Sequence, residues 1–225
     1  MDATVVVTGA TGGIGASVCR AFADEGASVV CSGRDADALD ALVDDLDGAT
    51  GVRADVRDEF DMERLMEQAA RVDDGIDVVV PVAGVYHGDA GATPLAGESY
   101  AAWDDTMRTN ARGVYAAVRE ALPHLAADGR VVVPTGSVAR EPGAGYGTYA
   151  VSKAAAEAVA RGFAAELDQT VGCVDPGVVA TDLTGGRGRD PEAVAPQFVW
   201  AAQVDPDVLD GEVLTRADWT AATRD

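Results

Sequence analysis

The sequence is poor in metal-binding and disulfide-forming residues. Its 225 residues include two histidines, His87 and His124, and three widely spaced cysteines, Cys19, Cys31 and Cys173. Two histidines do not provide the ligand cluster of a histidine-based metal site, and three separated cysteines match neither a disulfide framework nor a zinc pattern. We therefore expect no metal site, and buried, reduced thiols as in the cytoplasm.

Long apolar runs are also missing. No stretch of 18 uncharged apolar residues occurs, whereas a helix that crosses a bilayer needs about that many. The N-terminal segment MDATVVVTGATGG enters an apolar run without a basic segment before it, so we expect no signal peptide. These features predict a cytoplasmic protein that does not enter membranes.

Positive charge is scarce, and lysine is nearly absent. The chain has 38 acidic and 17 basic residues, for a formal net charge of −21, and Lys153 is its one lysine. Such a chain repels nucleic acid and anionic membranes, so neither is an expected partner. The dispersed acids and missing lysines indicate adaptation to high salt, since at about 1 M the Debye length is about 3 Å. Ordinary acidic solubility is the alternative.

What the chain does contain is an alternation of short apolar runs and helical patterns. The runs predict strands at residues 4–8, 28–32, 51–54, 76–82, 130–134, 171–174 and 212–215, and the helical patterns predict helices at residues 14–26, 35–46, 60–72, 99–122, 148–167 and 191–203. This order predicts a single α/β domain over residues 1–225: a doubly wound parallel sheet of the Rossmann type, in three layers. Such sheets bind ligands beyond the carboxyl ends of their strands.

Glycines follow the first expected strand. Residues 8–15 read TGATGGIG and lead directly into a helical pattern. Glycine lets the backbone approach a pyrophosphate closely, and the N-terminus of the next helix favours the anion. A glycine cluster alone also fits a plain turn, but its place between strand and helix predicts dinucleotide binding. The expected contacts are Gly9, Thr11, Gly12, Gly13, Ile14 and Gly15.

The second expected strand ends in the sequence Ser32-Gly33-Arg34. Chains that bind NAD usually place an acid here to hold the ribose 2′-hydroxyl. An arginine can instead bind a 2′-phosphate through charge-assisted hydrogen bonds. Ser32 and Arg34 therefore favour NADP(H), with NAD(H) as the alternative if Arg34 merely pairs with Asp35 or Asp37.

Later strand ends predict further cofactor contacts. Asp55 could accept a hydrogen bond from the adenine amino group while Val56 packs on the ring, although both also fit the start of a helix. Ala83 and Gly84 would let the cofactor pass close to the backbone, unless they form an ordinary turn.

The segment after the sixth strand has the same position at the sheet edge. Pro176, Gly177, Val179 and Thr181 are expected to hold the nicotinamide amide. Residues 182–192, which contain the run GGRG, are either a short lid or a plain surface loop.

Tyr149 and Lys153 are the expected centre of the chemistry. They lie four residues apart in a helical pattern and so share a face. An ammonium beside a phenol favours the phenolate and would lower the tyrosine pKa from about 10. A surface Tyr149 with Lys153 paired to Glu157 is the alternative. A lysine retained in a lysine-poor chain favours the catalytic interpretation, because its compact, tunable charge is something arginine lacks.

Two further polar residues are placed for the same reaction. Ser137 follows the fifth strand, where its hydroxyl could orient a substrate carbonyl. Asn110 falls on the apolar stripe of a helix, where an amide must find a partner. It either binds a relay water that connects to Lys153 or braces a broken helical turn.

Together these residues resemble the short-chain dehydrogenase/reductase family across the whole chain. The resemblance is carried by the TGxxxGxG-like loop at residues 8–15, Asp55, the Ala83-Gly84 pair, the tetrad Asn110, Ser137, Tyr149 and Lys153, and Pro176-Gly177 with Thr181. The chain departs from the family pattern at Pro81-Val82, which replace two asparagines. It is also short after Gly177, which predicts an open pocket.

The resemblance implies an oxidoreductase similar to NADP(H)-dependent 3-oxoacyl-carrier and carbonyl reductases, and the acidic, lysine-poor composition predicts that it comes from a halophile. It implies that Tyr149 gives or takes the substrate proton, Lys153 tunes it and holds the nicotinamide ribose, Ser137 orients the carbonyl, and Asn110 holds a relay water. Its partner would be a small carbonyl or alcohol substrate. It further implies a homotetramer or homodimer. A non-catalytic NADP(H)-sensing regulator and a nucleotide-sugar epimerase are the alternatives, and the latter needs a larger C-terminal domain.

Overall fold

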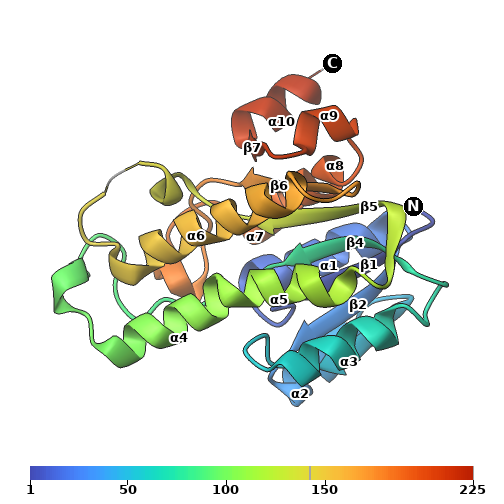
Figure 1. Ribbon diagram of the computed structural model, residues 1–225, viewed down its shortest axis with the longest axis horizontal. Helices are drawn as coiled ribbons and strands as arrows, with labels where there is room; N and C mark the ends of the chain where they lie inside the picture. Colours follow the sequence, from blue (N-terminus) through green and yellow to red (C-terminus); the bar gives the residue numbers. More distant parts are fainter. Residues whose placement is uncertain (142, 225) are drawn as a thin grey trace.

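The computed structural model describes residues 1–141 and 143–224, and a parallel sheet runs through its centre (Figure 1). Seven strands in this part of the chain pair in the order β3-β2-β1-β4-β5-β6-β7. Their bounds are Thr4–Thr8, Ser28–Gly33, Ala49–Arg53, Ile76–Pro81, Leu125–Pro134, Thr170–Asp175 and Val213–Thr215 for β1 to β7. The strand order reverses between β1 and β4, and a sheet of this kind binds ligands at such a switch point.

Helices cover both faces of the sheet. In the described residues these are α1 (Gly13–Asp24), α2 (Ala36–Asp44), α3 (Glu59–Ala69), α4 (Tyr100–Asn110), α5 (Arg112–Ala121), α6 (Gly147–Ala164), α7 (Pro191–Val194), α8 (Pro196–Ala201), α9 (Pro206–Leu209) and α10 (Arg216–Ala222). Figure 1 shows α5 and α6 running side by side, with α9, β7 and α10 together at one end. The expected doubly wound fold is confirmed.

Two buried clusters, one on each face, explain the continuously apolar strands. In β1, Val6 packs with α3, α5 and α6, while Val5 and Val7 face the cluster formed by α1, α2 and α8. Successive strand residues point to opposite faces, so a strand covered on both sides must be apolar at every position. The cysteines Cys19, Cys31 and Cys173 are free and buried in these clusters.

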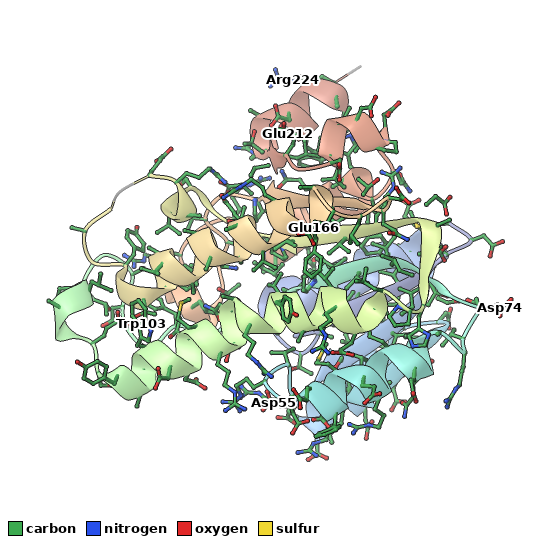
Figure 2. All side chains as sticks on the ribbon, in the orientation of Figure 1. Asp55, Asp74, Trp103, Glu166, Glu212 and Arg224 are labelled. Atoms are coloured by element: carbon green, nitrogen blue, oxygen red, sulfur yellow. The ribbon has the colours of Figure 1, made fainter. Side chains whose placement is uncertain are left out.

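Acidic side chains lie mostly on the outside of the molecule. Asp74, Glu166 and Glu212, which are labelled in Figure 2, are all exposed. None of the helices in residues 1–141 and 143–224 has the length and apolar character that a membrane crossing requires.

Two long helices expected from the sequence are each interrupted. The pattern at residues 99–122 forms α4 and α5, separated at Ala111, and the pattern at residues 191–203 forms α7 and α8. Pro196 explains the second break, because proline lacks the N–H that would continue the helical hydrogen bonding, although Ala195 before it keeps helical backbone angles. At the first break the apolar periodicity continues, so the pattern does not detect it.

Other boundaries also differ from expectation. Strand β5 begins at Leu125 instead of 130, because Leu125 pairs with Ile76 through an irregular register. The short helices α9 and α10 were not expected. Their start signals are present in the sequence, however: Asp205 caps α9, and Thr215 with Asp218 forms a capping box on α10.

Candidate active site

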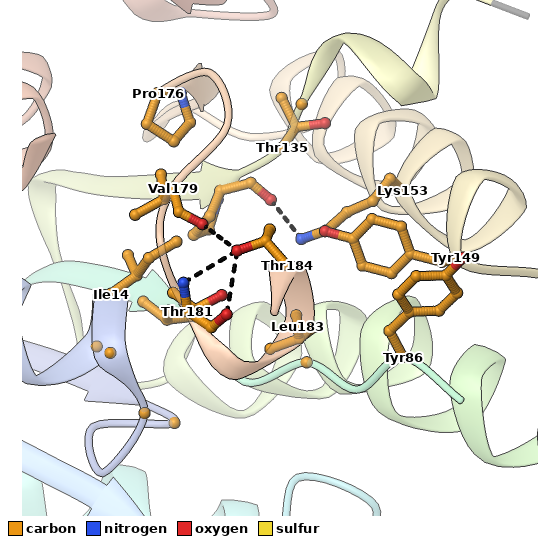
Figure 3. Close-up of a pocket in the computed structure, with 18 of the residues that line it drawn as sticks. Ile14, Tyr86, Thr135, Tyr149, Lys153, Pro176, Val179, Thr181, Leu183 and Thr184 are labelled. Atoms are coloured by element: carbon orange, nitrogen blue, oxygen red, sulfur yellow. Dashed lines mark hydrogen bonds between the residues drawn. The ribbon is translucent and has the colours of Figure 1, made fainter. Parts of the chain in front are cut away.

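A cavity of about 990 Å³ opens at the carboxyl ends of the strands (Figure 3). The structure brings nearly all the expected site residues to its wall. These are Gly9, Thr11, Gly12, Gly13, Ile14, Gly15, Arg34, Asp55, Val56, Ala83, Gly84, Ser137, Tyr149, Lys153, Pro176, Gly177, Val179 and Thr181. Ser32 and Asn110 do not line it.

The glycine loop lies against the end of β4 without space for side chains. Gly9 has φ +68°, and a Cβ on it would lie 2.6 Å from the Cα of Ala83. A Cβ on Gly15 would lie 2.1 Å from the carbonyl oxygen of Gly9. These two positions accept only glycine, because any side chain would displace backbone.

Helix α1 begins at this loop without a capping side chain. Gly12 is its N-cap, and its first turn contains no acidic residue. By contrast, Asp35, Asp58 and Ser99 cap α2, α3 and α4 with their own side chains. The first amides of a helix need acceptors, so α1 presents free donors and the positive end of its dipole to an anion in the cavity.

Arg34 lies exposed at the rim beyond β2 and lines the cavity. Asp35 is used to cap α2 through the amide of Ala38. Within the described residues, no ion pair involves Arg34, Asp35 or Asp37. The alternative in which a neighbouring acid neutralises Arg34 therefore does not occur here.

Ser32 lies beneath the glycine loop instead of in the cavity. Ser32 is 1% exposed, and its backbone carbonyl oxygen accepts a 2.9 Å hydrogen bond from the amide of Ala10. Because strand residues alternate between faces, Gly33 reaches the cavity and Ser32 does not. The expected contact of Ser32 with the cofactor is replaced by support of the loop backbone.

Asp55 is held in place by an arginine two residues away. Its Oδ2 lies 2.6 Å from Nη2 of Arg57, whose Nη1 lies 2.6 Å from Oδ1 of Asp105. Hydrogen bonding from Arg57 lowers the pKa of Asp55 below its ordinary value. The carboxylate at this wall is therefore charged at neutral pH and fixed as an acceptor.

Tyr149 and Lys153 project from α6 into the middle of the cavity (Figure 3). The Nζ of Lys153 lies 5.8 Å from the centroid of the Tyr149 ring and donates a 3.1 Å hydrogen bond to the carbonyl of Pro134. The ring of Tyr86 lies 4.9 Å from that of Tyr149. The spacing of four residues thus places phenol and ammonium on one face, as expected.

The pKa of Tyr149 differs from the expectation. Burial, with smaller effects from Tyr86 and Asp175, raises the pKa of Tyr149 to about 12. Burial also lowers the pKa of Lys153 to about 8. The expected lowering of the phenol pKa was wrong, because burial raises the Tyr149 pKa, and the Lys153 ammonium is hydrogen-bonded to the carbonyl of Pro134.

Ser137 begins the short helical turn η2 (Ser137–Ala139) directly after β5. The residue is exposed to the cavity. Its backbone carbonyl accepts hydrogen bonds from the amides of Arg140 and Glu141, which fixes the turn. No described residue bonds its side-chain hydroxyl, so that group is free to meet a ligand.

Asn110 braces the site from behind its wall. Its Oδ1 accepts from the amide of Val85, and its Nδ2 donates to the carbonyl of Val85 and to Oγ of Ser152. The side chain thus joins the segment after β4 to α6. Both Nδ2 hydrogens are thus used, while Oδ1 keeps a second lone pair. Ala111, where the two helices meet, still donates to the carbonyl of Met107 and accepts from the amide of Tyr115. The expected relay water at Asn110 stays a prediction.

The segment after Thr181 folds against the cavity as a closed loop. It contains η3 (Asp182–Thr184), and Oγ1 of Thr184 contacts Val179 and Thr181, as Figure 3 shows. Arg187 reaches across to the carbonyl of Ala90 at 3.4 Å. The residues expected to form a lid therefore touch the opposite wall.

Sequence reasoning missed the contribution of the C-terminal segment and several wall residues. Thr215, Arg216 and Ala217 line the cavity, because β7 ends at the same sheet edge as the other strands. The expected strand at 212–215 was a usable signal for them. The aromatic wall formed by Tyr86 and Tyr146 had no such signal. Among the described residues, no group of three or more His, Cys, Asp or Glu could hold a metal ion.

The model of the short chain dehydrogenase family matches residues 3–192. The chain is 32% identical to the glycine betaine reductase ATRR of Emericella nidulans, with 93% of this chain but only 18% of that protein covered. It is 29% identical to an uncharacterised oxidoreductase of Staphylococcus haemolyticus, with 94% of this chain and 95% of that protein covered.

A solved structure agrees over the same length. A short chain dehydrogenase from Burkholderia cenocepacia, in complex with NADP, superposes with a TM-score of 0.85 at 26% identity. The alignment covers 95% of each chain.

Proposed function

Since the chain belongs to the short-chain dehydrogenase family, we propose that it is an NADP(H)-dependent oxidoreductase acting on a small carbonyl or secondary alcohol. The observation that carries the proposal is one cavity that joins the tightly packed glycine loop to Tyr149, Lys153 and a free Ser137 hydroxyl. A dinucleotide would lie along the glycine loop, with its nicotinamide beside Tyr149 and Lys153.

The cofactor end fits a dinucleotide phosphate. Gly9 packs closely against Ala83, and Gly15 packs against the Gly9 carbonyl, so the loop is held tightly at the uncapped start of α1, where a pyrophosphate would bind. Arg34 would hold the 2′-phosphate, and Asp55 would accept from the adenine amino group with Val56 against the ring. Ala83 and Gly84 would flank the ribose side, and Pro176, Gly177, Val179 and Thr181 would hold the nicotinamide amide. NAD(H) is the second candidate.

When bound, the nicotinamide would supply or accept the hydride. Tyr149, whose raised pKa keeps it protonated at neutral pH, would give its proton to the substrate oxygen during reduction. Ser137 would donate a hydrogen bond to that oxygen and hold it near the phenol. Lys153 would stabilise the phenolate, and Asn110 would fix α6 against the segment after β4.

The other predictions remain part of this proposal. We infer a cytoplasmic protein of a saline cell, with no nucleic-acid or membrane partner, one domain and a lid at residues 182–192. A homotetramer or homodimer is supported by Tyr100 and Tyr115, which are 89% and 44% exposed on α4 and α5. Sedimentation in concentrated salt that gave a monomer mass would overturn the oligomer.

Fluorescence titration with NADPH and NADH in concentrated potassium chloride tests the cofactor. We expect tighter NADPH binding, followed by NADPH oxidation in a screen of aldehydes and ketones. Tight binding without turnover of any carbonyl would instead favour the NADP(H)-sensing regulator on the same fold. No binding by the folded protein would overturn both functions.

A further inference from the structure

Two buried carboxylates lie behind the catalytic residues. Glu157 follows Lys153 by one turn of α6 and is 2% exposed, and Asp175 ends β6 and is 7% exposed. A buried charge destabilises a protein by several kcal/mol unless it is paired. Lys153 does not pair with either carboxylate, because its Nζ donates to the carbonyl of Pro134.

Arg140 pairs with both carboxylates at once. Its Nη1 donates to Oε1 of Glu157, and its Nη2 donates to Oδ2 of Asp175 at 2.5 Å. Thr135, at the end of β5, donates a further 2.7 Å hydrogen bond to Glu157. The planar fork of a guanidinium can address two acceptors in fixed directions, which the single ammonium of lysine cannot.

These contacts join three segments that line the cavity. Arg140 follows the turn that starts with Ser137, Glu157 belongs to the helix that carries Lys153, and Asp175 leads into the turn at Gly177. Oδ1 of Asp175 also accepts a 3.0 Å hydrogen bond from the amide of Gly177. One side chain therefore sets the position of the serine hydroxyl, the catalytic helix and the turn expected to hold the nicotinamide.

We propose that Arg140 is a positioning residue, which clamps the Ser137 turn and the Gly177 turn to α6 through Glu157 and Asp175. This inference rests on the proposed function for its kinetic consequence, but the clamp itself is a property of the fold. A displacement of about 1 Å can lower a rate about 100-fold when reacting groups must be aligned. Removing Arg140 should therefore reduce turnover more than cofactor binding.

Arg140→Met and Arg161→Met form a matched pair for the test. Arg161 also faces Glu157, but its Nη1 lies 3.6 Å away and its side chain is 54% exposed. We expect R140M to lower kcat on the order of 100-fold. The NADPH dissociation constant should change by no more than about 3-fold, because only the turn at the nicotinamide end is displaced while the glycine loop and Arg34 are unaltered. R161M should stay near the wild-type values, as expected for an exposed ion pair. Equal effects of the two substitutions would overturn the proposal.

A triple variant, R140M/E157Q/D175N, separates positioning from charge neutralisation. It removes the uncompensated carboxylates and should regain the wild-type thermal midpoint if R140M alone folds poorly. We expect its kcat to remain low, because the fork is still missing. Recovery of the full wild-type kcat would mean that Arg140 only neutralises charge, and would overturn the positioning role.

Amide hydrogen exchange of the variants, measured without cofactor, tests the clamp independently of the proposed enzymatic activity. In R140M, amides of segments 135–141 and 175–178 should lose protection, while those of R161M should not. This readout needs no turnover. Unchanged exchange in R140M would overturn the clamp, whereas wild-type protein that reduces no carbonyl would overturn the proposed function and leave the exchange result standing.

Discussion

One end of the cavity is formed mainly by backbone atoms and the other mainly by side chains. The end formed by β1, the glycine loop and α1 consists mainly of backbone, with no space for a side chain at Gly9 or Gly15 and with an uncapped helix start. The end formed by β5, β6 and α6 consists of side chains, with Tyr149 and Lys153 facing the cavity and charged groups behind them.

Charge is handled differently at the two ends as well. After β3, Asp55 pairs with Arg57, two residues along the chain, and the pair is partly exposed. Behind Tyr149 and Lys153, Arg140 pairs with Glu157 and Asp175, 17 and 35 residues away, and the acids are buried. The pair of Asp55 with Arg57 is thus local in sequence, although Arg57 also reaches Asp105 and Gly9 packs against Ala83. The pairs at the side-chain-built end all join distant segments.

The largest expected effect is at the side-chain-built end. Tyr149→Phe removes the proton donor, so kcat should fall by about 10² to 10⁴, the range typical of lost acid–base catalysis. NADPH affinity should persist, because the other end is intact. Steady-state kinetics and fluorescence titration measure both, and Tyr115→Phe on α5 is the control. Full activity in the Tyr149 variant would show that the proposed chemistry is wrong.

Gly15→Ala tests the backbone-built end. The added Cβ would lie 2.1 Å from the Gly9 carbonyl, so the loop must move, and NADPH affinity should fall with a loss of stability of about 1 to 3 kcal/mol. Isothermal titration and urea unfolding measure the two effects. Gly162→Ala is the matched control, since that added Cβ meets nothing within 4 Å in α6. It should raise stability by about 1 kcal/mol, and equal behaviour of the two variants would contradict the role of the loop.

Arg34→Ser tests the side chain that we propose selects NADPH over NADH at the backbone-built end. NADPH affinity should fall about 10- to 100-fold, the equivalent of about 1.5 to 3 kcal/mol for hydrogen bonds to a charged group. NADH affinity should hardly change, because NADH lacks the 2′-phosphate. The same titration of Arg20→Ser, on α1, is the control. A parallel loss for both nucleotides would remove the argument for NADP(H).

The smallest effect concerns the pH dependence of the cofactor-free protein. The pKa of Lys153 is lowered from 10.5 to about 8 by burial, so between these values the unfolded chain binds a proton that the folded chain does not. Stability therefore rises with pH through this window. Lys153→Met should be more stable than wild type at pH 7 by about 1 to 2 kcal/mol, and the difference should shrink towards pH 10. Urea unfolding at several pH values measures it, and a difference independent of pH would contradict the lowered pKa.

The fold and the backbone-built end follow largely from sequence. Strand-helix alternation predicts the doubly wound sheet, and glycines between strand and helix predict the loop, because the required conformations are local. Spacing alone also places Tyr149 and Lys153 on one face of α6. Only folding shows that Ser32 lies beneath the loop, since the difference from Gly33 is which face of β2 each residue points to.

Tertiary structure alone decided the remaining features of the side-chain-built end. The break at Ala111 lies within continuous apolar periodicity, and the partner of the Asn110 amide is Val85, 25 residues away. The direction of the Tyr149 pKa shift depends on burial, which spacing does not reveal. Arg140 could be chosen from the sequence only by knowing that β5, β6 and α6 bring its two carboxylates together. Local conformation is encoded by neighbouring residues, but burial and long-range charge pairing arise only when distant segments pack.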